Sequence, residues 1–280
     1  MKRYCSIFLV VFVFAAGCRQ SNRARINVWK DITAAELIGR QEIEQTKVKT
    51  VGLNIHIFQI DSARLPEIQH LMCQTSTLPI SYSSSGHSPP PPNAASVFSS
   101  NGLICCAGDK NDWQKISKPL FKSKSTSRIN KSTSLYAVEN ISDDIIVGEI
   151  LQPVSILYYS GGAAASGVGL DAGQVGLRIK TSSPIGLRQV CRIEITPIYK
   201  IGLPQQTKQP ANQSNREFIF ESAAMITRLG IGQFILIAPA AAEAHPEGIK
   251  TIGDIMFYPQ KPQKTVTLYL IACNTIKEPI

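Results

Sequence analysis

The strongest constraint on the fold is a series of short apolar runs that fills the second half of the chain. From Ser132 onward, runs rich in Val, Ile, Leu, Phe and Tyr recur roughly every ten to fifteen residues, separated by Gly, Pro or Asn. Such runs are typical of β-strands joined by short connections. They are SLYAVEN (134–140), DIIVGEIL (144–151), VSILYYS (154–160), VGLRIKT (175–181), VCRIEITPIYK (190–200), EFIFESAAMITRL (217–229), QFILIAP (233–239) and KTVTLYLIAC (264–273).

The last of these runs shows the period of a strand most clearly. Val266, Leu268 and Leu270 alternate with Thr and Tyr residues. Because successive side chains of a strand point to opposite faces, this alternation predicts a strand that is buried on one face and exposed on the other.

The first part of the domain combines strands with helices. VGLNIHIFQID (51–61) suits a buried strand, and SVFSSNGLICCAG (96–108) predicts a strand that contains a turn at Asn101-Gly102. ARLPEIQHLM (63–72) and NDWQKISKPLF (111–121) place apolar residues at helical spacing. The sequence therefore predicts an α+β fold that is mainly β, an antiparallel sheet assembly with two or three short helices.

The domain boundaries follow from shifts in composition. Residues 51–280 are expected to form a single β-rich domain, interrupted by a Ser- and Pro-rich surface loop at 77–96. Residues 18–50 are polar and charged, and are expected to be a tether with a helical patch.

Residues 1–17 have the composition of a secretory signal peptide. Two basic residues precede an apolar run that is shorter than the about 20 residues needed to cross a bilayer. The end of the run, Ala-Ala-Gly-Cys at 15–18, resembles the lipobox of bacterial lipoproteins, with Ala15 where Leu is usual. The resemblance implies cleavage before Cys18 and acylation of its thiol, so that lipid holds the chain at a membrane. An ordinary signal peptide, with Cys18 incidental, is the alternative.

The remaining cysteines show no metal-binding spacing. No Cys-x-x-Cys occurs, and the adjacent Cys105 and Cys106 point to opposite faces if they lie on a strand. Cys191 and Cys273 lie in apolar runs and are expected to be buried as small hydrophobic residues. Together with Cys73, the cysteines that follow Cys18 number five, so they cannot all pair with one another, and which of them form disulfides stays open.

The chain is basic, with a formal net charge of +9. The densest basic segment, 118–131, carries no nucleic-acid motif, so we expect a solvated basic edge and no nucleic-acid partner. Attraction to anionic lipid head groups is the alternative.

No short motif assigns a catalytic residue, a cofactor or a metal. The glycine-rich segment 161–176 precedes a strand rather than a helix, so a hairpin explains it better than a phosphate-binding loop does. Asp143 and Asp144 are expected to form a turn before a strand. His56 in a strand and His245 in a loop have no partner visible in the sequence.

The order of the apolar segments between 51 and 276 resembles the bacterial secretin domain. The segments 175–200, 216–239 and 251–276 stand where that domain has its paired strands, its next hairpin and its closing strand. The paired Pro-Leu-Gly turns of the family are missing, and 161–167 matches its gate hairpins poorly. The resemblance implies a reduced relative that forms no pore.

These observations predict an envelope lipoprotein with a non-enzymatic structural or accessory role. Lipid on Cys18 would place it at the outer membrane facing the periplasm, since Arg19 gives no inner-membrane retention signal. Partners would be the membrane and either an envelope protein or a second copy. The alternative is a lipoprotein that binds a ligand or polymer, and a hydrolase with a dispersed site is a third.

Overall fold

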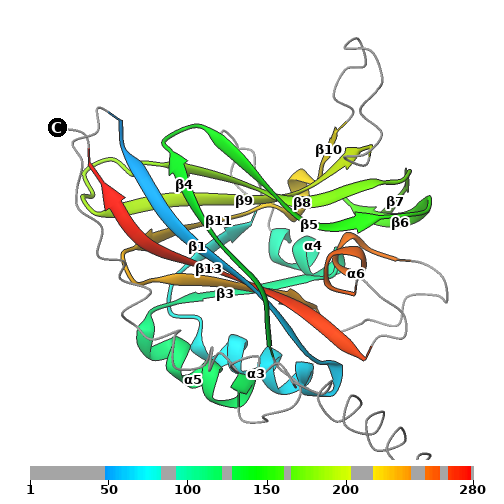
Figure 1. The fold of residues 1–280 in the computed structure, drawn as a ribbon, viewed down its shortest axis with the longest axis horizontal. Coiled ribbons are helices and arrows are strands. Elements are labelled where there is room, and N and C mark those ends of the chain that lie inside the picture. Colours follow the sequence, from blue (N-terminus) through cyan, green and yellow to red (C-terminus); the bar gives the residue numbers. More distant parts are fainter. Residues whose placement is uncertain are drawn as a thin grey trace, which may run out of the picture. The chain divides into compact units, whose positions relative to one another are not determined.

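The computed structural model places two antiparallel sheets face to face, with helices packed around them (Figure 1). All described residues belong to the unit Ile32–Ile280. The predicted signal peptide, Cys18 and nearly all of the predicted tether lie outside the described residues. The structure describes residues 48–82, 93–121, 128–160, 165–202, 217–240, 250–258 and 264–278, with no account of the side chains of 128–130.

The first sheet has five strands in the order β3-β12-β13-β1-β4. Its centre is the long antiparallel pair β1 and β13, which extends from Thr50 opposite Lys277 to Asp61 opposite Thr265, with one shift in register between Gly52 and Leu53. Both strands are rich in Val, Ile and Leu, as expected for strands covered on both faces. The bounds are β1 Thr50–Asp61, β3 Leu103–Gly108, β4 Arg128–Val138, β12 Phe234–Pro239 and β13 Thr265–Lys277.

The second sheet has the order β2-β11-β9-β8-β5, and the short β10 also pairs with β9. Strands β6 and β7 form a separate hairpin, as predicted for the glycine-rich segment. The bounds are β2 Ile80–Tyr82, β5 Ser142–Ile150, β6 Val154–Tyr159, β7 Ala165–Leu170, β8 Gly173–Ser182, β9 Val190–Ile201, β10 Glu217–Ile219 and β11 Met225–Gly230. The mainly β, antiparallel α+β class is therefore confirmed.

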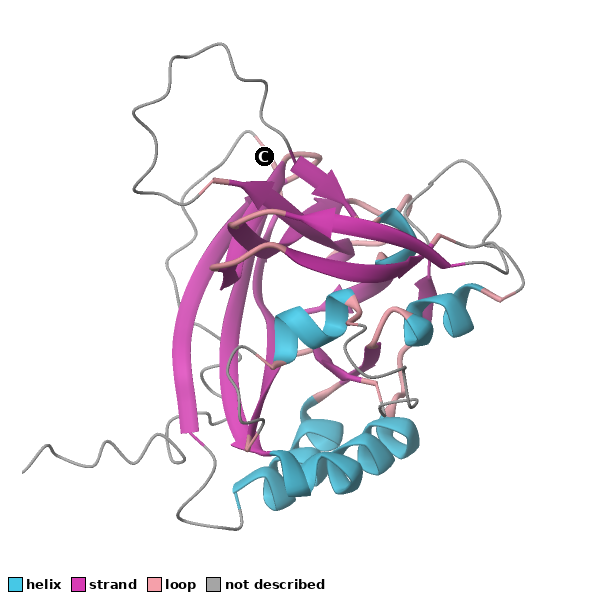
Figure 2. Cartoon of the chain, turned by 90° about the vertical axis from the view of Figure 1, so that its right-hand side faces the viewer, coloured by secondary structure: helices cyan, strands magenta, loops and turns pink. Residues whose placement is uncertain are grey.

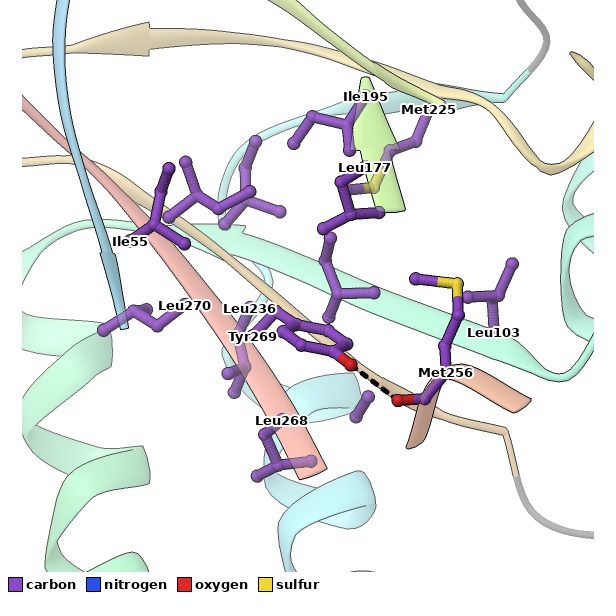
Figure 3. Packing of buried hydrophobic residues seen from close by; sticks show 14 of the residues in the cluster. Ile55, Leu103, Leu177, Ile195, Met225, Leu236, Met256, Leu268, Tyr269 and Leu270 are labelled. Atoms are coloured by element: carbon purple, nitrogen blue, oxygen red, sulfur yellow. Dashed lines mark hydrogen bonds between the residues drawn. The ribbon is translucent and has the colours of Figure 1, made fainter. Parts of the chain in front are cut away.

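The core lies between the facing surfaces of the two sheets. Ile55 of the first sheet lies toward Leu177 and Ile195 of the second (Figure 3), and all three are at most 1% exposed. Burial of this many branched side chains supplies the main driving force for folding.

The other face of the first sheet is covered by helices α3 and α5, which lie side by side (Figures 1 and 2). The rings of Phe58 on β1 and Trp113 on α5 are 6.0 Å apart. The prediction that β13 is exposed on one face is wrong, because the second sheet covers the face that carries Thr267 and Tyr269, which are 6% and 0% exposed. The bounds are α3 Leu65–Thr75 and α5 Lys110–Phe121, and a short 3-10 helix at Ser62–Arg64 leads into α3.

Two helices stand where the sequence analysis placed other structure. Helix α4, Ala94–Ser100, replaces the first half of the strand predicted at 96–108. Its buried residues Ala94, Val97 and Phe98 share one face of the helix. The predicted turn at Asn101-Gly102 is confirmed, and Gly102 has a φ of +82°. The predicted loop at 77–96 also contains β2, while its run of four consecutive prolines at 89–92 lies outside the described residues.

Helix α6, Ile252–Phe257, was not predicted. It begins with a capping box, in which Thr251 and Asp254 each accept a hydrogen bond from the other's backbone N–H. The described residues also include a 3-10 helix at Glu221–Ala223. None of the helices in the described ranges is long and apolar enough to cross a bilayer.

Two tight connections carry the chain from one sheet to the other. Residues 139–141 join β4 to β5, and the N–H of Asn140 donates to the carbonyl of Thr181 in β8 over 2.7 Å. Residues 231–233 join β11 to β12, and the N–H of Gly232 donates to the carbonyl of Cys273 over 2.8 Å. Gly232 has a φ of +81°, which glycine adopts without strain.

Candidate functional site: the edge of strand β4

The two sheets end in four edge strands, and three of these are protected against pairing with another chain. Strand β3 is covered in part because the N–H groups of Thr77 and Leu78 both donate to the carbonyl of Ala107 over 3.1 Å. Strand β2 is only three residues long, and the ring of its Tyr82 lies 4.8 Å from that of Phe98. Short or covered edges offer little template for a foreign strand.

Strand β5 is protected by charge and by its shape. It carries Asp143, Asp144 and Glu149, and its register with β8 shifts between Ile146 and Gly148. Charged side chains and bulges are the usual devices that keep an edge from pairing.

Over most of its length, strand β4 has neither charged side chains nor a bulge. After Lys131, the segment STSLYAV (132–138) contains no charge, proline or glycine. It pairs with β1 without interruption, from Ser132 opposite His56 to Val138 opposite Thr50. Among the described residues, no strand pairs with its other side. This edge is therefore a ready pairing surface, and its lack of charge was a signal visible in the sequence.

The outward face of this edge is polar. The hydroxyl of Ser134 donates to Oδ1 of Asn54 over 2.9 Å, and Ser132 Oγ lies 3.0 Å from Nδ1 of His56. His56 is 8% exposed, and burial lowers its pKa, so the imidazole is neutral at neutral pH. Neutral hydrogen-bonding groups can adapt to an incoming strand without losing an ion pair.

A small hollow of about 120 Å³ opens beside the edge. Asn274 is one of its lining residues, and Oδ1 of this side chain is buried and has no hydrogen-bond partner among the described residues. Pockets for drug-sized ligands measure about 300 to 1,000 Å³, so this hollow suits one polar group. Its lining is Gly52, Leu53, Asn54, Ser134, Leu135, Tyr136, Asn274 and Thr275.

The pair of Ser132 and His56 does not form a triad in the described part of the chain. Catalysis by such a pair needs a third group that orients the imidazole, and no described carboxylate hydrogen-bonds to His56. His70 is exposed and bonds to Gln74 in the same helix. His87 and His245 lie outside the described residues.

The other candidates from the sequence have structural surroundings. Asp143 and Asp144 lie within β5 and do not form the predicted turn before it. Asp144 pairs over 2.7 Å with Arg178 of the neighbouring strand β8, and over 2.7 Å with Lys200 of β9, the next strand in the sheet. Within the described ranges, no three His, Cys, Asp or Glu side chains are placed to hold a metal ion.

The cysteines follow the sequence prediction where the structure describes them. Cys106 is 1% exposed and Cys105 is half-buried, in agreement with opposite faces of β3. Cys191 and Cys273 are both fully buried, as predicted. Cys18, the predicted lipidation site, lies outside the described residues.

No protein-family model and no curated protein matches the sequence. Among solved structures, three secretins show weak similarity. The secretin-domain β-barrel of InvG from the Salmonella SPI-1 injectisome is 8% identical, with 83% of this chain covered and a TM-score of 0.19. A chain of the ETEC pilotin-secretin AspS-GspD complex is 10% identical, with 90% of this chain covered and a TM-score of 0.20. The V. cholerae type IV competence pilus secretin PilQ is 8% identical, with 84% covered and a TM-score of 0.18.

TM-scores of this size do not establish a shared fold. The matches cover 62%, 53% and 61% of the lengths of these three chains.

Proposed function

We propose that this chain is an exported, lipid-anchored component of a bacterial envelope assembly, with a structural rather than enzymatic role. It joins its partner by strand addition, in which an extended segment of another protein pairs with the edge of β4. The observation that carries the proposal is the uncharged, uninterrupted edge at 132–138, since the other three edge strands of the two large sheets are protected.

The length of this edge suits strand addition. Seven residues of strand span about 23 Å at about 3.3 Å per residue, which is longer than an average strand. Main-chain hydrogen bonds would give the affinity, and side-chain contacts on alternate residues would give the specificity. Ser134 and Tyr136 are exposed on the face that an added strand would extend.

The proposed lipid on Cys18 would hold the chain at a membrane. Acyl chains on Cys18 contribute about 0.8 kcal/mol per buried methylene, so several chains hold a protein at a membrane durably. Confinement to one membrane raises the effective concentration of edge and partner, because both then diffuse in a thin layer. A modest strand-to-strand affinity is then sufficient for assembly.

A second candidate function is the binding of a ligand or polymer. The unpartnered Oδ1 of Asn274 favours it, because a buried acceptor without a donor is costly and a bound polar group would satisfy it. The size of the hollow limits this function to one protruding group, such as a hydroxyl or an amide of a longer molecule.

Site-specific photo-crosslinking in native envelopes tests the proposal. A benzophenone amino acid replaces Ser134 on β4 in one variant and Ser142 on β5 in its matched control. Both positions are exposed serines on edge strands. We expect a covalent adduct from position 134 and none from position 142. Mass spectrometry of the joined peptides then distinguishes a second copy of this chain from a different envelope protein.

Two results would overturn strand addition. One is the absence of an adduct from position 134, and the other is equal labelling from both positions. An adduct to a saccharide or another non-protein polymer at position 134 would support the second candidate instead.

A further inference from the structure

Cys191 and Cys273 face each other across the core from different sheets. Cys191 is the second residue of β9 and points inward with Ile193 and Ile195, and Cys273 belongs to the inward face of β13 with Ile271. All of these side chains are at most 1% exposed.

The tight turn between β11 and β12 brings the two cysteines together. On the side of the second sheet, Cys191 pairs with Leu229, and its Sγ donates to the carbonyl of Leu229 over 3.4 Å. On the side of the first sheet, the N–H of Cys273 donates to the carbonyl of Gln233 over 2.9 Å. The two residues therefore flank the same turn, and their thiols lie close enough for each to shift the pKa of the other.

A buried lysine stands beside the pair. Lys49 is 3% exposed, and its Nζ lies 2.9 Å from Oε1 of Glu278 and 3.3 Å from the carbonyl oxygen of Val190, the neighbour of Cys191. The hydrogen bond from Cys273, and after it the charge of Lys49, lower the pKa of the Cys191 thiol, although burial opposes them.

The other buried thiols of the described residues, Cys273, Cys105 and Cys106, have raised pKa values. The hydrogen bond to Cys191, together with burial, raises the pKa of Cys273. Burial raises the pKa of Cys105 to about 12 and also raises that of Cys106. Because the thiolate is the reactive form, the lowered pKa of Cys191 favours it over Cys273 as the attacking thiol.

We propose that Cys191 and Cys273 form a reversible disulfide that clips the two sheets together, by exchange with a small disulfide such as oxidised glutathione. The Cys191 thiolate attacks one sulfur of the oxidant, which forms a mixed disulfide and releases one glutathione thiolate. This thiolate takes the proton of Cys273, and the Cys273 sulfur then attacks Sγ of Cys191 and releases the second glutathione. This second glutathione thiolate is protonated by the proton that Cys191 lost to solvent. Overall, the two cysteines give up two electrons and two protons, and the oxidised glutathione becomes two thiols.

The surroundings of Cys191 provide a route for the oxidant. Residues 185–189, directly before β9, are all exposed, and Gln189 has a φ of +55°. Few buried contacts hold such a segment, so it can open locally without unfolding of the sheets. The clip requires neither the lipid anchor nor strand addition at β4, and it goes beyond the proposed function.

Thiol counting on the full chain tests the proposal. The protein is purified in its reduced state, incubated with oxidised glutathione, denatured, and labelled with a maleimide. We expect two labels fewer than in the reduced sample, and a peptide map that joins Cys191 to Cys273. Closing a loop of this length should raise Tm by roughly 10 °C relative to the reduced protein.

Variants supply the controls. Cys191→Ser and Cys273→Ser should each abolish the shift in Tm, whereas Cys106→Ser, at another buried thiol, should retain it. Retention of both labels at Cys191 and Cys273, or a linkage that joins either to another cysteine, would overturn the proposal. The peptide map of the unmodified chain decides this even if a variant fails to fold.

Discussion

The hydroxyl of Tyr269 donates a hydrogen bond of 2.5 Å to the backbone carbonyl of Met256 (Figure 3). Strand β13, at the centre of the first sheet, thereby holds helix α6 against the core. Tyr269 is fully buried, and burial raises its pKa, so the phenol keeps its proton and stays a donor.

Replacing this tyrosine tests how much the bond contributes. Tyr269→Phe leaves the carbonyl of Met256 without a partner, and we expect a loss of about 1 to 3 kcal/mol in the free energy of unfolding. Urea unfolding followed by circular dichroism measures it. Tyr159→Phe, at a half-buried tyrosine, is the control, and an equal effect in both variants would contradict the prediction.

The close approach of two glycines makes a second prediction. A Cβ atom on Gly253 in α6 would overlap the carbonyl oxygen of Gly102, whose neighbour Asn101 accepts a hydrogen bond from the Gly253 N–H over 3.0 Å. Gly253→Ala is therefore expected to destabilise the fold by about 1 to 3 kcal/mol, although alanine is the better helix former. Thermal unfolding measures the effect. Gly167→Ala, which meets nothing within 4 Å, should change stability little, and a more stable Gly253→Ala would refute the steric argument.

The ion pairs of Asp144 predict how stability depends on pH. Hydrogen bonds from Arg178 hold the pKa of this carboxyl below its usual range. A carboxyl with a lowered pKa stabilises the fold above its unfolded pKa of about 3.9, and the contribution is lost as the pH falls through the folded pKa. Asp144→Asn should therefore cost roughly 1 kcal/mol near pH 7 and less below about pH 3. Urea unfolding at several pH values measures this, with Glu149→Gln as an exposed control; parallel curves for wild type and Asp144→Asn would contradict it.

A charge on the β4 edge should abolish partner binding without unfolding the protein. Ser134→Lys places an ammonium on the face that an added strand would extend, and lysine on an edge is a common block to pairing. We expect loss of the partner in native purification, with a stability change within about 1 kcal/mol. Ser142→Lys makes the same substitution on β5 and should retain the partner, and equal retention in both variants would contradict strand addition.

Lipidation at Cys18 is tested directly by metabolic labelling with a tagged fatty acid. Cys18→Ser should lose the label and move the protein from the membrane fraction to the soluble fraction. A Cys73→Ser control should keep both, because that cysteine lies within the domain. Labelling that persists in Cys18→Ser would remove the anchor from the proposed function.

The strands were predictable because their signal is local. Runs such as 190–200 and 264–273 combine apolar residues with turn residues at both ends, and each became a strand. Helix α4 was missed because Val97 and Phe98 favour strands in isolation, and only the contacts of α4 decide the issue. Helix α6 could have been found, since Thr251 and Asp254 have the spacing of a capping box.

The candidate sites could not be predicted from the sequence, because they depend on contacts between segments that are far apart in the chain. The uncharged segment 132–138 is visible in the sequence, but its place at an edge follows from pairing with β1 alone. The burial of Tyr269 follows from the second sheet, which covers that face of β13. Cys191 and Cys273 were expected to be buried, whereas their meeting across the core depends on the turn at 231–233.

The connection at 139–141 has a mechanical consequence. The N–H of Glu139 donates to the carbonyl of Lys49 beside β1 over 3.1 Å, while Asn140 is bonded to β8 in the other sheet. A pull that reaches this joint through β4 would therefore load hydrogen bonds of both sheets and not of the first sheet alone. The end of β4 that adjoins the connection is thus tied to two layers of the fold, whereas an ordinary edge strand is tied only to its neighbour in one sheet.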